Sequence, residues 1–171
     1  ESITSHTIML PGTTDTNHLG YQPSSKEETT HLTRLFAYRG KAKYERDVEI
    51  PKAWKNTRPT LFLERTKPTQ VYLDNVYVGS SNDISTPQRY ILQIKKPGLH
   101  HVTIIVDNAS GVPQQIYASS HAYTEDTQTN WNGIIGQIYI KAENSLEDTT
   151  NTYNGPTNDC FKDFHADQHH F

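Results

Sequence analysis

The stretch AKYERDVEI, residues 42–50, decides the fold class of this chain. Larger or apolar side chains alternate with charged ones along it, and Pro51 follows directly. Side chains two residues apart lie on the same face of a β-strand, and proline cannot continue the hydrogen-bond ladder of a central strand. The stretch therefore predicts a strand with one buried face, which carries Ala42, Tyr44, Arg46, Val48 and Ile50.

Other segments have the same character. QVYLDNVYVG, residues 70–79, predicts a hairpin with its turn at Asp74 and Asn75, because these residue types tolerate the left-handed backbone of a tight turn. Further strands are predicted within residues 60–66, 90–94, 101–108 and 136–142, and no segment carries a sustained helical stripe. Short strands separated by Pro, Gly and Asn predict an all-β antiparallel sandwich of the jelly-roll or a similar type.

Length and composition suit one domain with a polar extension. The chain has 171 residues, of which 33% are hydrophobic, a fraction that suits strands burying one face each better than a helical bundle. We predict a domain over residues 1–143, with a long surface loop at 11–30, and a polar tail or linker over 144–171. Phe161, Phe164 and Phe171 suggest one side of a short helix in that tail.

The charge balance and hydropathy argue against two classes of partner. A net charge of −3 gives no support for a nucleic acid, which requires a clustered basic surface. No run approaches the roughly 20 apolar residues of a membrane span. The sequence opens at Glu1, which we interpret as the sign of a removed signal peptide or of trimming.

Metal and cofactor chemistry finds little support. Cys160 is the single cysteine, so the chain can form neither an intrachain disulfide nor a cysteine cage for a metal. His165 and His169 would share one face of a helix, with acidic residues close by, but a solvated terminus is the better interpretation because a third fixed ligand is missing. His100 and His101 must point to opposite faces of a strand. We predict no metal site and no cofactor.

The sequence also carries no recognisable catalytic motif. Sugar hydrolysis requires two carboxylates at a defined separation, and Asp15, Glu125 and Asp126 are not tied to any partner by the sequence. The chain contains no phosphate-binding glycine loop and no nucleophile elbow.

Carbohydrate binding has a better basis in the segment SHAYTEDTQTNWN, residues 120–132. Aromatic faces pack on the C–H surfaces of sugars, and amides and carboxylates bind paired hydroxyl groups. The segment holds such side chains at His121, Tyr123, Glu125, Gln128, Asn130, Trp131 and Asn132. An alternative is equally open, in which Trp131 closes one end of the sandwich and the asparagines bond to backbone.

Five segments in order resemble one known family. They are GKAKYERDVEIPKAW, LFLERTKPTQVYLDNVYVGSS, STPQRYIL, PGLHHVTIIVDN and NWNGIIGQIYI, and the earlier LPGTTDTNHLG and ETTHLTRLF are similar too. Together they resemble the N-terminal sugar-binding domain of glycoside hydrolase family 2, which includes β-galactosidases, β-glucuronidases and β-mannosidases. The resemblance extends over about residues 6–142.

The resemblance implies a galactose-binding-like jelly-roll. In the family this domain precedes an immunoglobulin-like domain and a barrel that carries both catalytic glutamates, so the chain alone is not expected to be catalytic. Loops of the jelly-roll can complete the substrate pocket of the barrel. The positions that match such loops, and that are therefore candidate glycan contacts, are Asp15, Asn17, His121, Asn130, Trp131 and Asn132.

We therefore expect a non-catalytic accessory domain of a secreted or periplasmic family 2 glycosidase, which helps to position a β-linked glycan at a separate barrel. Its expected partners are that glycan and the immunoglobulin-like and barrel domains of the parent enzyme. The alternatives are a stand-alone carbohydrate-binding module and a structural domain that supports the barrel without binding sugar.

Overall fold

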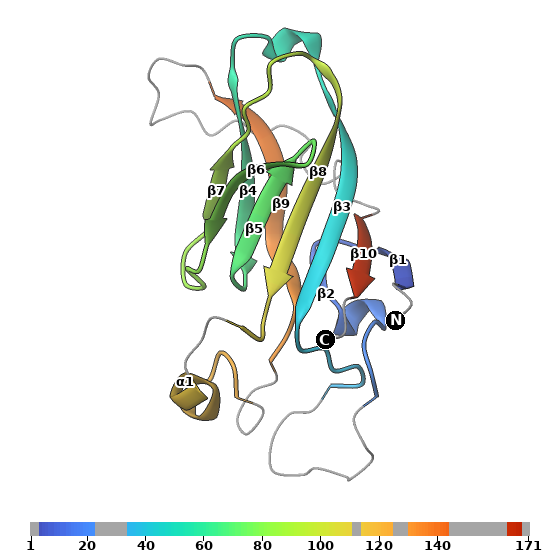
Figure 1. The fold of residues 1–171 in the computed structure, drawn as a ribbon, viewed down its shortest axis with the longest axis vertical. Helices are drawn as coiled ribbons and strands as arrows, with labels where there is room; N and C mark the ends of the chain where they lie inside the picture. The colour runs from blue at the N-terminus through green and yellow to red at the C-terminus, as the bar shows by residue number, and fades with distance from the viewer. Residues whose placement is uncertain (1–3, 23–33, 111–113, 125–129, 144–163, 169–171) are drawn as a thin grey trace.

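The computed structural model describes residues 4–22, 34–110, 114–124, 130–143 and 164–168. These residues form two antiparallel β-sheets that pack face to face (Figure 1). The six-stranded sheet contains, in spatial order, β1 (Thr4–Ile8), β10 (Phe164–Gln168), β3 (Lys41–Ile50), β8 (Gly98–Asp107), β5 (Thr69–Leu73) and β6 (Val76–Ser81). The four-stranded sheet contains β2 (Gly12–Thr13), β9 (Gly133–Glu143), β4 (Arg58–Thr66) and β7 (Gln88–Ile91).

The chain crosses between the sheets at nearly every step after β3. Strand β4 lies in the four-stranded sheet, β5 and β6 return to the six-stranded sheet, and β7, β8 and β9 then alternate between the two. Such repeated crossing is typical of a jelly-roll. The predicted all-β antiparallel sandwich is therefore confirmed.

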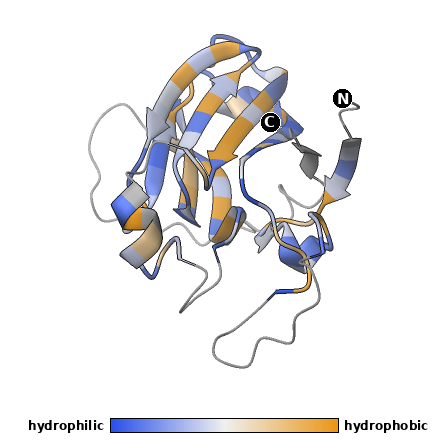
Figure 2. Cartoon of the chain, turned by 60° about the horizontal axis from the view of Figure 1, so that its bottom comes forward, coloured by the Kyte–Doolittle hydropathy of each residue, from blue (hydrophilic) through white to orange (hydrophobic). Residues whose placement is uncertain are grey.

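The core lies between the inner faces of the two sheets. In β3, Ala42 and Tyr44 are fully buried, and the neighbouring strand β8 buries Val102, Ile104 and Val106 in the same way. Figure 2 shows hydrophobic and hydrophilic residues interleaved along strands of the sandwich. The two-residue periodicity of the sequence therefore placed these side chains correctly.

Two turns depend on unusual backbone angles. Asp74 and Asn75 join β5 to β6 with φ of 50° and 64°, as the type I′ turn of a two-residue hairpin requires. Gly133 has a φ of 147° at the start of β9, and a Cβ there would lie 2.3 Å from the carbonyl oxygen of Gly12. A glycine is needed at this point because β2 pairs so closely with β9.

Four short elements depart from the sequence prediction. Residues 114–119 form the helix α1 (Gln114–Ser119), where no helix was expected. The surface loop predicted at 11–30 contains β2 and the 3-10 helix η1 (Asp15–Asn17), and residues 23–33 lie outside the described part. A second 3-10 helix, η2 (Lys52–Trp54), follows β3 directly after Pro51.

The tail contributes a strand to the sandwich. Residues 164–168 form β10, which pairs with β1 on one side and β3 on the other, so the helix expected through Phe164 is wrong at this position. A strand between two sheet edges satisfies the backbone groups of both neighbours, which a helix cannot do. Phe161 and Phe171 lie outside the described residues, and the division at residues 143 and 144 stays a prediction.

Within the described part of the chain, no helix combines the length and apolar character that crossing a bilayer requires.

Candidate functional site

The predicted glycan contacts gather near one end of the sandwich, at the bottom of Figure 1, where β3 begins, β8 ends and β9 begins. Asn130, Trp131 and Asn132 lead into β9, while η1 carries Asp15 and Asn17. His121 follows α1 in the adjoining segment.

Asn132 is a structural link between segments of the sandwich. Its side chain is fully buried, its Oδ1 accepts a hydrogen bond of 2.8 Å from the Tyr44 hydroxyl, and its Nδ2 donates to the carbonyls of Gly40 and Val106 at 3.1 and 2.9 Å. Burial raises the pKa of the Tyr44 phenol far above its ordinary value, so this hydroxyl remains a neutral donor. The amide of Asn132 is therefore fully used inside the protein.

Two further buried asparagines, Asn130 and Asn108, form a hydrogen-bond network next to Asn132. Asn130 is 1% exposed and donates from Nδ2 to the carbonyl of Asn108 at 2.9 Å. Asn108 in turn accepts from the Gly40 amide at 2.8 Å and donates to the Tyr38 carbonyl at 2.8 Å. The end of β8, the start of β3 and the approach to β9 are thus tied by side-chain amides.

Asp15 and Asn17 hold the N-terminal segment. Asp15 Oδ1 accepts a hydrogen bond of 2.8 Å from the Phe36 amide. Asn17 Oδ1 accepts from the Met9 amide at 2.7 Å, and its Nδ2 donates to the carbonyls of Met9 and Thr13. Both side chains are partly exposed, and both have hydrogen-bond partners on the backbone.

Trp131 and His121 retain exposed surface. Trp131 is half-buried, with Lys67 Nζ 5.1 Å from its ring centroid. The same ammonium lies 4.3 Å from the ring centroid of Tyr123 and donates to the Ala122 carbonyl, so a buried cation fixes the segment after α1 to the sandwich. His121 is exposed on that segment.

The six predicted residues therefore separate into three groups, the first being Asp15 and Asn17, which are partly exposed and bonded to backbone. Asn130 and Asn132 are buried and bonded to the protein itself, as the structural alternative requires. Trp131, which is half-buried, and His121, which is exposed, offer side-chain surface to solvent. Their contact with a glycan stays a prediction, and Glu125 and Gln128 lie outside the described residues.

The two adjacent histidines of β8 have separate acidic partners. His100 Nδ1 lies 2.7 Å from Asp74 Oδ2, and its Nε2 lies 2.7 Å from the Lys96 carbonyl oxygen. His101 Nδ1 lies 2.7 Å from Asp47 Oδ1, and its Nε2 lies 3.4 Å from Glu45 Oε1. Among the described residues, no group of three or more histidine, cysteine or acidic side chains could hold a metal ion.

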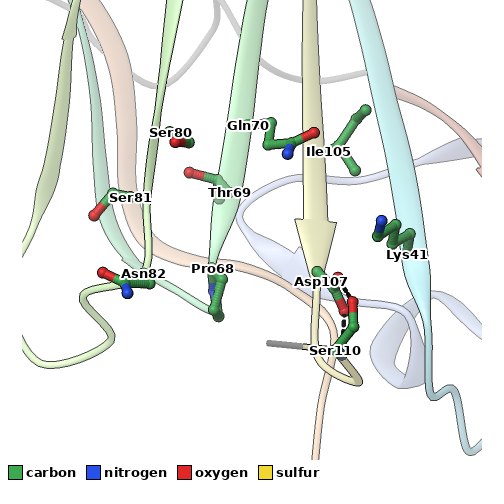
Figure 3. A pocket seen from close by; sticks show the side chains of 10 residues that line it. All are labelled: Lys41, Pro68, Thr69, Gln70, Ser80, Ser81, Asn82, Ile105, Asp107 and Ser110. Carbon is green, nitrogen blue, oxygen red and sulfur yellow. Dashed lines mark hydrogen bonds between the residues drawn. The ribbon is translucent and has the colours of Figure 1, made fainter. Parts of the chain in front are cut away.

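A pocket that the sequence interpretation missed lies on the outer face of the six-stranded sheet (Figure 3). Its volume is about 410 Å³, and its walls come from β3, β5, β6, β8, the link before β5 and the segments that follow β6 and β8. The lining residues are Lys41, Pro68, Thr69, Gln70, Ser80, Ser81, Asn82, Ile105, Asp107 and Ser110. No contiguous motif in the sequence marks this pocket, because its lining residues come from several separate strands.

No protein-family model matches the chain, and a sequence comparison with curated proteins gives no match. Among solved structures, parts of β-glucuronidases are similar. A β-glucuronidase from Ruminococcus gnavus in complex with uronic isofagomine is 20% identical over 41% of this chain and 12% of its own length, with a TM-score of 0.38. A β-glucuronidase from Bifidobacterium dentium, complexed with coumarin-3-O-glucuronide, is 24% identical over 44% of this chain and 13% of its own length, with a TM-score of 0.40. The matched region is thus a small part of each of those proteins.

Proposed function

We propose that this chain is a non-catalytic accessory domain of a family 2 glycoside hydrolase, which helps to position a glycan at a catalytic barrel elsewhere in the same protein. The observation that carries the proposal is the order of the five family-like sequence segments between Gly40 and Ile140. These segments coincide with β3, with β4 to β6, with β7, with β8 and with β9 of the sandwich.

The end of the sandwich supplies the surface for this role. Trp131 presents part of an indole ring that Lys67 holds from the buried side, and His121 lies exposed on the segment that Lys67 anchors. A rigidly held aromatic ring is a suitable surface for the C–H face of a sugar. The buried asparagine network fixes the backbone on either side of that ring.

The purely structural alternative has one specific observation in its favour. The amides of Asn130 and Asn132 are bonded within the protein, so they stabilise this end of the sandwich whether or not sugar binds there. A structural domain would bury this end against the barrel. Trp131 would then contact protein instead of sugar.

The coding sequence and two assays test the proposal. A reading frame that continues into a barrel with a pair of catalytic glutamates is expected, and a stop codon directly after Phe171 contradicts the accessory role. The isolated chain is expected to leave 4-nitrophenyl β-galactoside, β-glucuronide and β-mannoside intact, and turnover of any of them contradicts it. In the longer protein, Trp131→Ala should raise KM for the preferred glycoside several-fold with little change in kcat. An unchanged KM favours the structural alternative.

A further inference from the structure

The outer face of the six-stranded sheet brings two tyrosines beside the pocket of Figure 3. Tyr72 on β5 and Tyr77 on β6 are cross-strand partners, and their rings meet edge to face with centroids 5.5 Å apart. Tyr77 is 54% exposed although it is a large aromatic residue. An exposed aromatic pair on a strand face is a surface that a ligand with an apolar side can cover.

Both phenol groups lean toward residues that line the pocket. The Tyr77 hydroxyl donates to Ser80 Oγ at 2.9 Å, and the Tyr72 hydroxyl lies 3.5 Å from Gln70 Oε1. Gln70 and Ser80 are themselves cross-strand partners in the pocket wall. The aromatic pair and the pocket therefore form one continuous surface, which we call the tyrosine face and define by Tyr72, Tyr77, Gln70 and Ser80.

The remaining pocket residues determine the chemistry of the ligand. Lys41 and Asp107 are cross-strand partners in β3 and β8, so one positive and one negative group lie side by side on the same wall of the pocket (Figure 3). The Asp107 carboxylate accepts hydrogen bonds from the amides of Ala109 and Ser110 at 2.9 and 2.8 Å, which ties it to its own turn. Ile105 adds an apolar patch between these polar groups.

Such a surface suits an uncharged ligand that has both an apolar face and many hydroxyl groups. The pocket volume of about 410 Å³ is in the range of sites that take small organic molecules. The exposed amides of Gln70 and Asn82 can each donate to one hydroxyl and accept from another. A hexose ring presents these features, with C–H groups on one face and neighbouring hydroxyls at its edge.

We propose that the tyrosine face and its adjoining pocket bind a neutral oligosaccharide, with a sugar ring against Tyr77 and Tyr72 and hydroxyl groups toward Gln70, Asn82 and Lys41. This surface lies on the outside of one sheet, whereas Trp131 belongs to the segment that leads into β9 of the other. The proposal therefore goes beyond the positioning role at that end. Either site can fail while the other holds.

Affinity gel electrophoresis of the whole chain tests this site. The chain is run through native gels that contain galactomannan, xylan, mixed-linkage β-glucan or the acidic polysaccharide alginate. At least one neutral polysaccharide is expected to slow migration, and its oligosaccharide then gives a Kd by calorimetry. Tyr77→Ala should weaken that Kd by about tenfold or more, which corresponds to about 1.4 kcal/mol or more, since truncation of an aromatic side chain at the centre of a contact commonly costs this much.

Matched variants separate sugar stacking from other effects. Tyr77→Phe keeps the ring and should stay within about threefold of the parent Kd, because only one hydroxyl hydrogen bond is removed. Tyr21→Ala removes a tyrosine that is 50% exposed outside this face, and it should leave binding unchanged. Gln70→Ala should weaken binding, while Trp131→Ala should not. Circular dichroism confirms that each variant is folded.

Three results would overturn the proposal. One is unretarded migration in every neutral polysaccharide. Another is retardation that persists in both Tyr77→Ala and Gln70→Ala. The third is retardation by alginate alone with loss in Lys41→Ala, which would assign the pocket to an anionic ligand instead of a neutral one.

Discussion

At the scale of single residues, the most informative side chain is Asn132. Asparagine beside tryptophan in a polar segment is typical both of a sugar contact and of a turn that bonds to its own backbone. The structure places this side chain at 0% exposure, with hydrogen bonds to Tyr44, Gly40 and Val106. Its amide therefore joins the two sheets, since Tyr44 belongs to one sheet and Asn132 leads into the other.

Asn132→Ala should lower the free energy of unfolding by about 3 kcal/mol, because it leaves the buried Tyr44 hydroxyl without its acceptor and removes one donor from each of the Gly40 and Val106 carbonyls. Urea unfolding followed by tryptophan fluorescence measures this change. Tyr44→Phe removes one partner from the same group and should cost about 1 kcal/mol. Asn82→Ala, at an exposed asparagine, serves as the control and should stay within about 0.5 kcal/mol. A loss at Asn132 as small as that of the control would show that the network contributes little.

At the scale of elements, the β5–β6 hairpin is tied to the start of β8 by Asp74. Its Oδ2 faces the His100 ring, and its Oδ1 accepts from the His101 amide at 2.8 Å. Both ring nitrogens of His100 face acceptors, namely this carboxylate and the Lys96 carbonyl. Only the imidazolium form can donate from both nitrogens, so the geometry favours a protonated ring.

The pKa values follow from these contacts. Partial burial lowers the pKa of His100, but the hydrogen bonds to Asp74 and to the Lys96 carbonyl and the nearby Glu49 charge raise it above its usual value overall. The hydrogen bond to Asp47 raises the pKa of His101, against a smaller effect of burial and with further support from Glu45. Hydrogen bonds from His100 and from the His101 amide hold the pKa of Asp74 below its usual value.

Stability should therefore depend on pH in a defined sense. A histidine whose pKa is higher in the folded chain than in the unfolded chain stabilises the fold. This contribution is complete below about pH 6.5, the histidine pKa in the unfolded chain, and it is lost as the pH rises through the pKa of the folded state. The Asp74 contribution is present above about pH 4 and is lost as pH falls further. The urea midpoint of the parent chain should exceed that of a His100→Gln/His101→Gln variant at pH 5.5, and the difference should shrink by pH 8.5. Asp74→Asn keeps a residue type that suits the turn, and it should remove only the part of the pH-dependent difference in urea midpoint that comes from His100. A difference that stays constant or grows with pH would contradict this account.

Some of these strands could be predicted from the sequence and others could not. Alternation in β3 and β8 placed Ala42, Tyr44 and Val102 correctly because a strand face is a local property of period two. The strand β10 carried no such signal, since its sequence FHADQ is polar and short, and it forms by pairing with β1 and β3 far away in the chain. The orientation of Asn132 was equally beyond local reasoning, because its partners come from separate strands. The pocket of Figure 3 combines residues 41 to 110, and no contiguous motif records it.

At the scale of the whole molecule, β10 adds residues 164–168 to the six-stranded sheet. Residues 165–168 pair with residues 42–45 of β3, while β10 also pairs with β1 along its length. Among the described strands, β3 would become an edge strand without β10, and β1 would lose the strand with which it pairs. An uncovered edge exposes backbone donors and acceptors that then exchange with water or pair with other chains.

A variant that ends at residue 143 tests this arrangement. Removing β10 should lower the free energy of unfolding by about 2 kcal/mol or more, since several paired backbone groups of β3 and β1 lose their partners. Hydrogen exchange followed by mass spectrometry should show faster exchange in peptides that cover residues 4–8 and 42–45, whereas β4 and β9, in the opposite sheet, should change much less. A control variant that retains the full length but carries Gly–Ser replacements within residues 145–155 should keep the original protection, because β10 remains able to pair. If the truncated chain shows the parent's protection in β3 and unfolds at the same urea concentration, β10 contributes nothing to the sandwich, and the boundary predicted after residue 143 would mark a separable tail.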